Sequence, residues 1–334
     1  MRHADVPLYR NPKTGQPLQV ATPVDPGAIL DEGTLREGGD EYAVVGGIPR
    51  FCPRENYAES FGFQWNKFDT VQLDSGSTWG QVSHDRLFAQ TEWSKDLRGQ
   101  RIMEAGCGMG RFTEHLVATG ADVWSFDYSR AVEANARNAS KATGSIPDNL
   151  HLAQGDIFAP PYAPASFDKV LCIGVIQHTP DPAKAFESLV RFVKPGGEIV
   201  IDCYRLDWQS FFLGKYWLRP LTKRVPPQRL HPLVAGYVRA VYPVTGAAQK
   251  VLGRNGRRLS WMLGMADYRG VFQADDKTLR ELSELDTFDM LAPAHDHPQT
   301  LATVEQWYRQ AGLQDIRVRK GWNGVEAKGV KPLS

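Results

Sequence analysis

Short apolar runs alternate with amphipathic stretches through the middle of the chain. Stretches with helical periodicity separate most of the apolar runs, and this regular alternation of strand and helix predicts a parallel, doubly wound α/β sheet. The apolar runs that predict strands are "RIMEA" (101–105), "DVWSFD" (122–127), "LHLAQGD" (150–156), "FDKVLCIGVI" (167–176) and "EIVIDCY" (198–204). The predicted helices are "GRFTEHLVATG" (110–120), "SRAVEANARNAS" (129–140) and "PAKAFESLVRFV" (182–193), the last followed by a turn at "KPGG".

The segments on either side of this region have other patterns. The N-terminal segment is rich in Gly and Pro, and its phrase "EYAVVGGIPRF" predicts a short strand and a turn. The last predicted helix, "TVEQWYRQAG", precedes a terminal antiparallel hairpin in "DIRVRKGWNGVEAKGV". We therefore expect a small β-rich module (1–55), a helical lid (56–98), an α/β core (99–204 and 298–334) and a helical cap insertion with an active-site loop (205–297).

Composition and charge narrow the protein class only a little. Apolar residues make up 42% of the chain, charged residues 23%, and the net charge is +1, as in ordinary globular proteins. The sequence has no apolar run long enough for a membrane span and no signal-peptide pattern at its start, so we expect a cytoplasmic protein. Its four cysteines are widely spaced, which predicts neither a disulfide framework nor a zinc site.

A glycine-rich turn follows the first predicted core strand, in "RIMEAGCGMGRFTEHL". The phosphate-binding pattern G-x-x-x-x-G-K-[ST] is absent, and the spacing G-x-G-x-G differs from the dinucleotide fingerprint. Asp127 ends the second strand, where a carboxylate can bind both ribose hydroxyls of a nucleoside cofactor. Asp156, after the third strand, is placed to accept the adenine amino group, with Ile157 against the ring.

Together these marks resemble the class I S-adenosylmethionine-dependent methyltransferases, over about residues 100–203. The resemblance implies a Rossmann-like fold and S-adenosylmethionine as the cofactor. It also implies that glycines of the turn pass under the methionine part of the cofactor and that backbone after the fourth strand faces its ammonium group. Glu104 would reach that ammonium through water or would be a solvated strand-end charge. The implied cofactor residues are Glu104, Gly106, Gly108, Gly110, Asp127, Asp156, Ile157, Ile173 and Gly174.

The methyl acceptor is indicated by the phrase after the fourth strand. Nucleobase amino-methyltransferases carry [DN]-P-P-[YF] there, whereas this chain has "IGVIQHTPDP", and its "APPY" (159–162) precedes the strand. The placement of His178 resembles that in ubiquinone-biosynthesis and other small-molecule methyltransferases. A histidine suits the role of general base for an alcohol acceptor. A helix-capping or purely structural histidine is the alternative.

A second polar cluster lies in "DTFDMLAPAHDHPQT" (286–300). Asp289, His295, Asp296 and His297 are residue types that bind metals, but their spacing is unspecific, and we expect no metal site. The stretch resembles the segment before the last helix in many small-molecule methyltransferases, which makes His295 and His297 secondary catalytic candidates. A solvated connection is the alternative.

The N-terminal module resembles the zinc-ribbon-like module that precedes some bacterial methyltransferases and ends in a phrase like "GGIPRF". The usual cysteine pairs are missing here, so the resemblance implies a module that has lost its metal. The aromatic phrase "FGFQWNKF" (61–68) would then be a lid over the cofactor, with Trp65 as a contact. A helix packed in the core is the other interpretation of these aromatics.

The cap insertion is strongly basic. From Arg205 to Arg258 it has eleven Lys and Arg against one acid, Asp207, a balance of +10, with interleaved aromatics. This favours an acidic or lipid-linked acceptor, or docking on the anionic inner face of a membrane. Nucleic acid also binds such patches, but no RNA-binding module accompanies this one. A solvated helical face is the remaining interpretation.

The sequence thus predicts methyl transfer from S-adenosylmethionine to oxygen, before nitrogen or carbon, of a small-molecule, glycan or lipid-linked intermediate. The alternatives are an RNA methyltransferase that uses the basic cap and a non-catalytic cofactor-binding regulatory partner.

Overall fold

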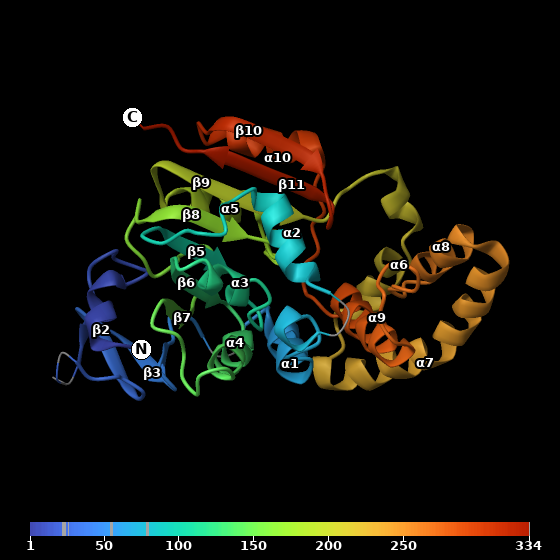
Figure 1. Cartoon of the computed structure of the whole chain (residues 1–334), viewed down its shortest axis with the longest axis horizontal. Helices are drawn as coiled ribbons and strands as arrows, with labels where there is room; N and C mark the ends of the chain where they lie inside the picture. The colour runs from blue at the N-terminus through green and yellow to red at the C-terminus, as the bar shows by residue number, and fades with distance from the viewer. Residues whose placement is uncertain (22–24, 26, 54–55, 78–79, 334) are drawn as a thin grey trace.

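The computed structural model describes residues 1–21, 25, 27–53, 56–77 and 80–333. Its larger sheet has the order β10-β11-β9-β8-β5-β6-β7, in which β9 to β7 are parallel and β11 is antiparallel to both of its neighbours (Figure 1). This confirms the predicted Rossmann-like sheet with a terminal antiparallel hairpin. The strands are β5 (Arg101–Ala105), β6 (Asp122–Asp127), β7 (Leu150–Gln154), β8 (Phe167–Cys172), β9 (Val193–Cys203), β10 (Gln314–Lys320) and β11 (Val325–Val330).

Both faces of this sheet are covered, as the apolar strand sequences require. Consecutive strand residues enter different core clusters: Met103 and Val170 belong to one, Ile102 and Leu171 to the other. The helices connecting the strands and closing the fold are α3 (Thr113–Ala118), α4 (Ala131–Ser140), α5 (Pro182–Val190) and α10 (Leu301–Gln310).

Two predicted boundaries were wrong. The predicted fourth strand ends at Cys172, four residues early, because Gly174 has a φ of +75° and the chain turns into the short helix η3 (Ile176–His178). The "KPGG" turn lies inside β9, which pairs with β8 at Val193, shifts register and resumes pairing at Glu198. A bulge therefore replaces the expected turn.

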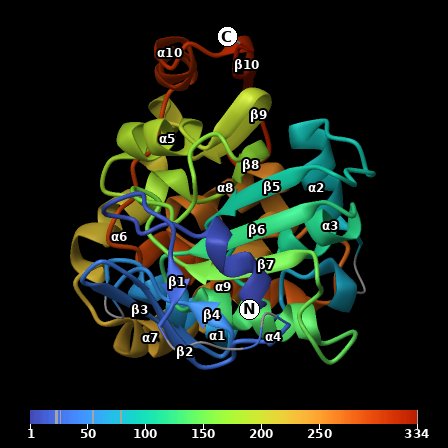
Figure 2. The ribbon, with the colours of Figure 1, turned by 90° about the vertical axis from the view of Figure 1, so that its left-hand side faces the viewer.

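The N-terminal segment forms a separate antiparallel sheet beside the edge strand β7 (Figure 2). Phe51 N–H donates to the Gln154 carbonyl at 2.7 Å, which joins the segment to β7. Its elements are η1 (His3–Leu8), β1 (Gln19–Val20), β2 (Gly33–Glu37), β3 (Asp40–Val45) and β4 (Ile48–Pro49).

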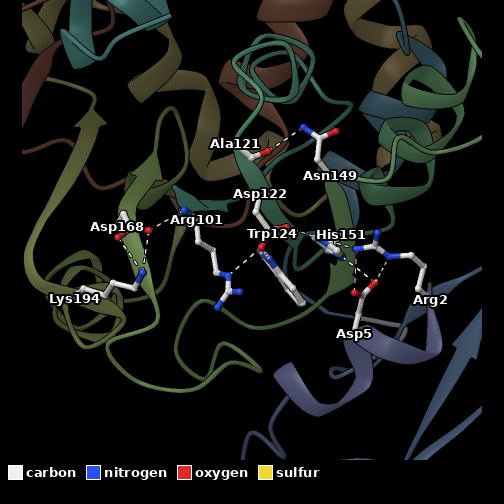
Figure 3. Close-up of polar contacts among 10 residues, drawn as sticks. All are labelled: Arg2, Asp5, Arg101, Ala121, Asp122, Trp124, Asn149, His151, Asp168 and Lys194. Atoms are coloured by element: carbon white, nitrogen blue, oxygen red, sulfur yellow. Dashed lines mark hydrogen bonds and ion pairs between the residues drawn. The ribbon is translucent and has the colours of Figure 1, made fainter. Parts of the chain in front are cut away.

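A polar network at the amino ends of the parallel strands fastens this segment to the core (Figure 3). His151 at the start of β7 contacts Asp5 of η1 at 3.1 Å and Asp122 of β6 at 2.7 Å through its two ring nitrogens. The His151 ring also stacks on Trp124, with centroids 4.1 Å apart. These groups are used structurally, which leaves the carboxyl ends of the strands for the functional site.

The lid and the cap lie at those carboxyl ends, and the cap extends to the right of the sheet in Figure 1. Every fourth residue of the long helix α7 faces the inside of the cap, where Leu230, Val234, Val238 and Tyr242 share one cluster with Phe288. The lid contains α1 (Glu59–Lys67), η2 (Asp74–Gly76) and α2 (Val82–Thr91). The cap contains η4 (Trp208–Phe212), α6 (Gly214–Thr222), α7 (Pro227–Leu252), α8 (Arg254–Met262) and α9 (Asp276–Leu291).

Candidate active site

A cavity of about 790 Å³ lies between the strand ends, the lid and the cap. Its size is within the range of small-molecule sites, and its position outside the carboxyl ends of parallel strands is where α/β sheets bind ligands. Of the predicted cofactor and catalytic residues, the cavity is lined by Trp65, Gly106, Gly108, Asp127, Ile157, Ile173, Gly174 and His178.

The glycine turn forms one wall of the cavity. Gly106 and Gly108 have φ values of +75° and +53°, a region that side chains disfavour. A Cβ at Gly108 would lie 3.5 Å from Nε1 of Trp65, so the lid tryptophan packs directly against the turn. Gly110 faces away from the cavity: a Cβ there would lie 2.7 Å from Oδ1 of Asn135. Because Gly110 has no side chain, Asn135 of α4 can pack closely against the turn.

Asp127 is held in place by the turn and by the residues after it. Its carboxylate accepts hydrogen bonds from Gly108 N–H at 2.9 Å, and from Ser129 N–H and Oγ at 2.8 and 2.6 Å. Burial raises the pKa of Asp127 above its usual value, against the lowering effect of these donors. Asp156 is half-buried and accepts from Phe158 N–H at 2.9 Å. It lies beside the cavity wall, which its neighbours Gly155 and Ile157 form.

Glu104 has a different environment from either predicted one. The side chain lies behind the glycine turn, outside the cavity wall, where Thr113 and Ser125 hydroxyls each donate to it at 2.6 Å. Only 3% of the residue is exposed, so it is not a solvated charge. Burial raises the pKa of Glu104 to about 7. The residue connects β5, α3 and β6 rather than facing a ligand.

The loop after β8 is fixed by a buried ion pair that the sequence pattern did not reveal. Gly174 N–H donates to one carboxylate oxygen of Asp202 at 2.6 Å, and Arg86 of the lid contacts the other at 2.6 Å. Both charged side chains are buried, and Arg86 also lines the cavity. The lid is thereby tied to the core beside the predicted ammonium position.

His178 is buried, and its ring lies between Phe61 and Tyr204, with centroids 4.9 and 5.3 Å away. Nδ1 lies 3.0 Å from the backbone carbonyl of His295. Because a carbonyl only accepts, Nδ1 carries the proton, and Nε2 of the neutral ring is free to accept one. Burial lowers the pKa of His178 below its usual value, which favours this neutral form at pH 7.

The cap forms the wall opposite the core with acids paired to tyrosines. Asp289 accepts from the Tyr204 hydroxyl at 3.0 Å and from Gln64 at 3.3 Å, whereas Asp286 accepts from the Tyr268 hydroxyl. Burial raises the pKa of Asp286 to about 6. Lining residues that the sequence interpretation missed include Tyr57, Arg86, Arg111, Tyr204, Lys215, Tyr268 and Asp286. No local motif marks them, because they meet only through the packing of lid and cap.

His295 and His297 line a second cavity of about 320 Å³, not the main one. Of the predicted segment 286–300, Asp286, Asp289 and Met290 line the main cavity, and the His295 backbone carbonyl contacts His178. Asp296 is buried against Lys215 at 2.8 Å and Arg219 at 3.7 Å. Within the described residues, the potential metal-ligand group is Asp74, Glu114 and His115, so residues 289–297 are not assembled as a metal site.

Comparison with known proteins places the core in a family. Residues 103–201 match the family described as "Methyltransferase domain". Ubiquinone biosynthesis O-methyltransferase of Aromatoleum aromaticum is 29% identical over 130 residues, covering 39% of this chain and 55% of that protein. The enzyme of the same name from Ralstonia nicotianae is 32% identical over 118 residues, covering 35% and 49%. The chain thus spans about half the length of these relatives.

Solved methyltransferase structures are more distant in sequence. Magnesium protoporphyrin IX methyltransferase of Synechocystis PCC 6803 is 13% identical with a TM-score of 0.45, over 82% of this chain and 96% of that chain. Human N-acetylserotonin methyltransferase is 14% identical with a TM-score of 0.44, over 83% and 57%. On the family match, the sequence relatives and the sheet order, this chain contains a class I S-adenosylmethionine-dependent methyltransferase domain.

Proposed function

We propose that the protein transfers a methyl group from S-adenosylmethionine to a hydroxyl oxygen of a small-molecule acceptor, with His178 as general base. The observation behind this proposal is a buried imidazole, with Nδ1 3.0 Å from a backbone carbonyl, that shares one cavity with the glycine turn and Asp127. The names of the sequence relatives, which are O-methyltransferases, support oxygen as the acceptor atom.

The cavity walls fit the cofactor chemically. Asp127 offers a carboxylate for ribose hydroxyls, and the half-buried Asp156 lies beside Ile157 for an adenine. A Cβ at Gly174 would meet no atom within 4 Å, so the backbone there faces open space. The bound cofactor supplies an electrophilic methyl group on a sulfonium.

His178 prepares the acceptor for this electrophile. The His295 carbonyl fixes the tautomer, and Phe61 and Tyr204 fix the ring plane, so Nε2 can accept the proton that the acceptor hydroxyl releases. The aromatic surroundings keep water from the ring, which maintains the lowered pKa. The remaining task of the cavity is to position the two reactants.

The test compares His178→Asn with His297→Ala, a control in the second cavity. Asparagine can still donate to the His295 carbonyl but is not a base. We measure S-adenosylhomocysteine release with a panel of phenols and aliphatic alcohols, and S-adenosylmethionine binding by calorimetry. His178→Asn should bind the cofactor as wild type and lose about 10²–10⁴-fold in kcat, whereas His297→Ala should retain activity. Full turnover by His178→Asn would exclude the base role.

A further inference from the structure

The segment that enters the cap has two chemically different faces. Its inner face lines the main cavity with Ser210, Leu213, Lys215 and Tyr216. Its outer face holds large apolar side chains that are mostly exposed. We call these residues the aromatic surface: Trp208 (69% exposed), Phe211 (72%), Phe212 (56%), Trp217 (74%) and Leu221 (71%).

The aromatic surface is one cluster. Trp217 Nε1 donates to the Phe211 carbonyl at 3.0 Å, which ties α6 to η4, and the rings of Trp208 and Phe212 lie 6.0 Å apart. Trp217 and Leu221 are one turn apart on the same side of α6. Scattered single apolar residues are normal on a protein surface, but a cluster of this kind marks an interaction site.

Exposed cations without acidic partners follow the aromatic surface along the chain. Lys223, Arg224 and Arg229 follow α6 and are exposed, and in the described part of the chain none has a carboxylate within 4.0 Å. Asp207, the one acid between residues 205 and 258, is already paired with Arg205 at 2.5 Å. The segment from η4 to the start of α7 therefore presents exposed aromatic groups and uncompensated positive charge.

The main cavity opens beside the aromatic surface. The exposed residues of its wall include Gln209 of η4, Val271, and Lys320 and Trp322 of the β10–β11 turn. Trp322 is 58% exposed, which adds another large aromatic side chain to the rim. An amphiphile held by its tail outside the protein could therefore place its polar end in the cavity.

We propose that the aromatic surface docks on an anionic lipid bilayer, so that the cavity receives a hydroxylated amphiphile with a hydrocarbon tail from the membrane. The membrane docking is argued from the aromatic surface alone, whereas the acceptor class rests on the proposed function. Aromatic and Leu side chains enter the headgroup boundary while neighbouring Lys and Arg pair with anionic headgroups. In the described residues no helix is long and apolar enough to cross a bilayer.

Charge and side-chain type favour a bilayer over other partners. A symmetric pair of this chain would bring the same unpaired cations together, which is unfavourable. Single-stranded RNA stacks on aromatic rings, but Leu221 and the neighbouring Leu206, which is 44% exposed, provide no stacking face. An acidic aqueous partner would leave the whole apolar cluster in water.

The experiment uses the full chain and two sets of vesicles. Sedimentation is measured with pure phosphatidylcholine and with an equal mixture of phosphatidylcholine and phosphatidylglycerol. The test variant is Trp208→Ser/Phe211→Ser/Trp217→Ser. The control is Ile29→Ser/Val45→Ser, which removes apolar side chains that are 76% and 45% exposed in the N-terminal segment. Calorimetry with S-adenosylmethionine checks that both variants are folded.

Wild type and the control should bind the mixed vesicles, in a salt-sensitive way, and the test variant should lose about tenfold or more in partitioning. No binding of wild type at low salt, equal binding of the test variant, or displacement from vesicles by polyuridylate at low concentration would each overturn the docking. Radiolabelled methyl from S-adenosylmethionine should appear in the organic phase of membrane extracts. Label only in the aqueous phase overturns the acceptor class, and vesicle binding without any label contradicts the proposed function alone.

Discussion

Substitution of Gly106 by alanine tests the glycine turn. Gly106 has a φ of +75°, and a Cβ there would lie 2.3 and 2.6 Å from the two γ-carbons of Val175 on the neighbouring loop. Such distances are far below van der Waals contact, and Val175 also lines the cavity. The substitution therefore combines backbone strain with a clash that pushes two walls of the site apart.

The two contributions can be separated by matched glycines. A left-handed φ costs a non-glycine residue about 1–2 kcal/mol, and overpacking adds about 1–3 kcal/mol. Gly15 has a φ of +73°, and a Cβ there would have no neighbouring atom within 4 Å. Gly15→Ala therefore introduces the backbone strain without a steric clash. Gly174, also at +75° and free of neighbours, lies on the cavity wall, so Gly174→Ala adds a methyl group within the site.

Urea unfolding and calorimetric titration with S-adenosylmethionine distinguish the three variants. Gly106→Ala should lose about 1–3 kcal/mol more unfolding free energy than Gly15→Ala, and should bind the cofactor weakly. Gly174→Ala should match Gly15→Ala in stability but bind the cofactor less tightly. Val175→Ala in the Gly106→Ala background should restore part of the lost stability. Equal stability of Gly106→Ala and Gly15→Ala would refute the clash.

Three further predictions concern buried carboxylates. Burial raises the pKa of Glu104 to about 7 from 4.5 in the unfolded chain, so stability should fall by about 3 kcal/mol as the pH rises between these values. Glu104→Gln should lack this component in unfolding measured across that pH range, and an unchanged pH profile would contradict the assignment. Asp127→Ala leaves the Gly108 N–H without its acceptor and removes the predicted ribose ligand, so affinity for S-adenosylmethionine should fall by about tenfold or more. An unchanged dissociation constant in calorimetry would show that Asp127 does not bind the ribose. Asp202→Asn breaks the buried pair with Arg86 and should cost about 3–5 kcal/mol in urea unfolding; a loss below about 1 kcal/mol would mean that the pair is not a strong restraint on the lid.

The order of elements in the core was predictable because each strand and helix has its own local pattern of apolar and polar residues. Buried parallel strands need continuous apolar runs, and the helices between them need one apolar face, so each element shows its type within a few residues. The cofactor end was predictable for a related reason. Turns such as Gly106–Gly108 and a strand-end acid such as Asp127 are set by short-range backbone geometry, which restricts residue types at fixed spacing.

The boundaries of β8 and β9 were harder to predict. Apolar residues continue past Cys172, but Gly174 turns the chain where its N–H binds Asp202, a residue of the neighbouring strand. The "KPGG" segment skips its partners on β8, but Gly196 N–H donates to the Lys331 carbonyl at 2.8 Å and Lys331 N–H donates to the Gly197 carbonyl at 2.9 Å. In both places a contact distant in sequence outweighed the local signal.

The environment of individual site residues was decided by tertiary structure alone. Glu104 has the spacing of a ligand-facing acid, yet α3 and β6 bury it between two hydroxyls. Asp289 meets Gln64, 225 residues away in sequence, because the lid and the cap fold over the same strand ends.

The sequence by itself thus determined the sheet, the cofactor turn and the basic, aromatic character of the cap, since each depends on neighbours in the chain. Only the tertiary structure decided that His178 is a buried ring on the cavity wall, that His295 and His297 do not line this cavity, and that the aromatic surface lies beside its opening. The physical reason is that burial, hydrogen-bond partners and the opening of a cavity are properties of packed elements, and residues far apart in sequence supply them.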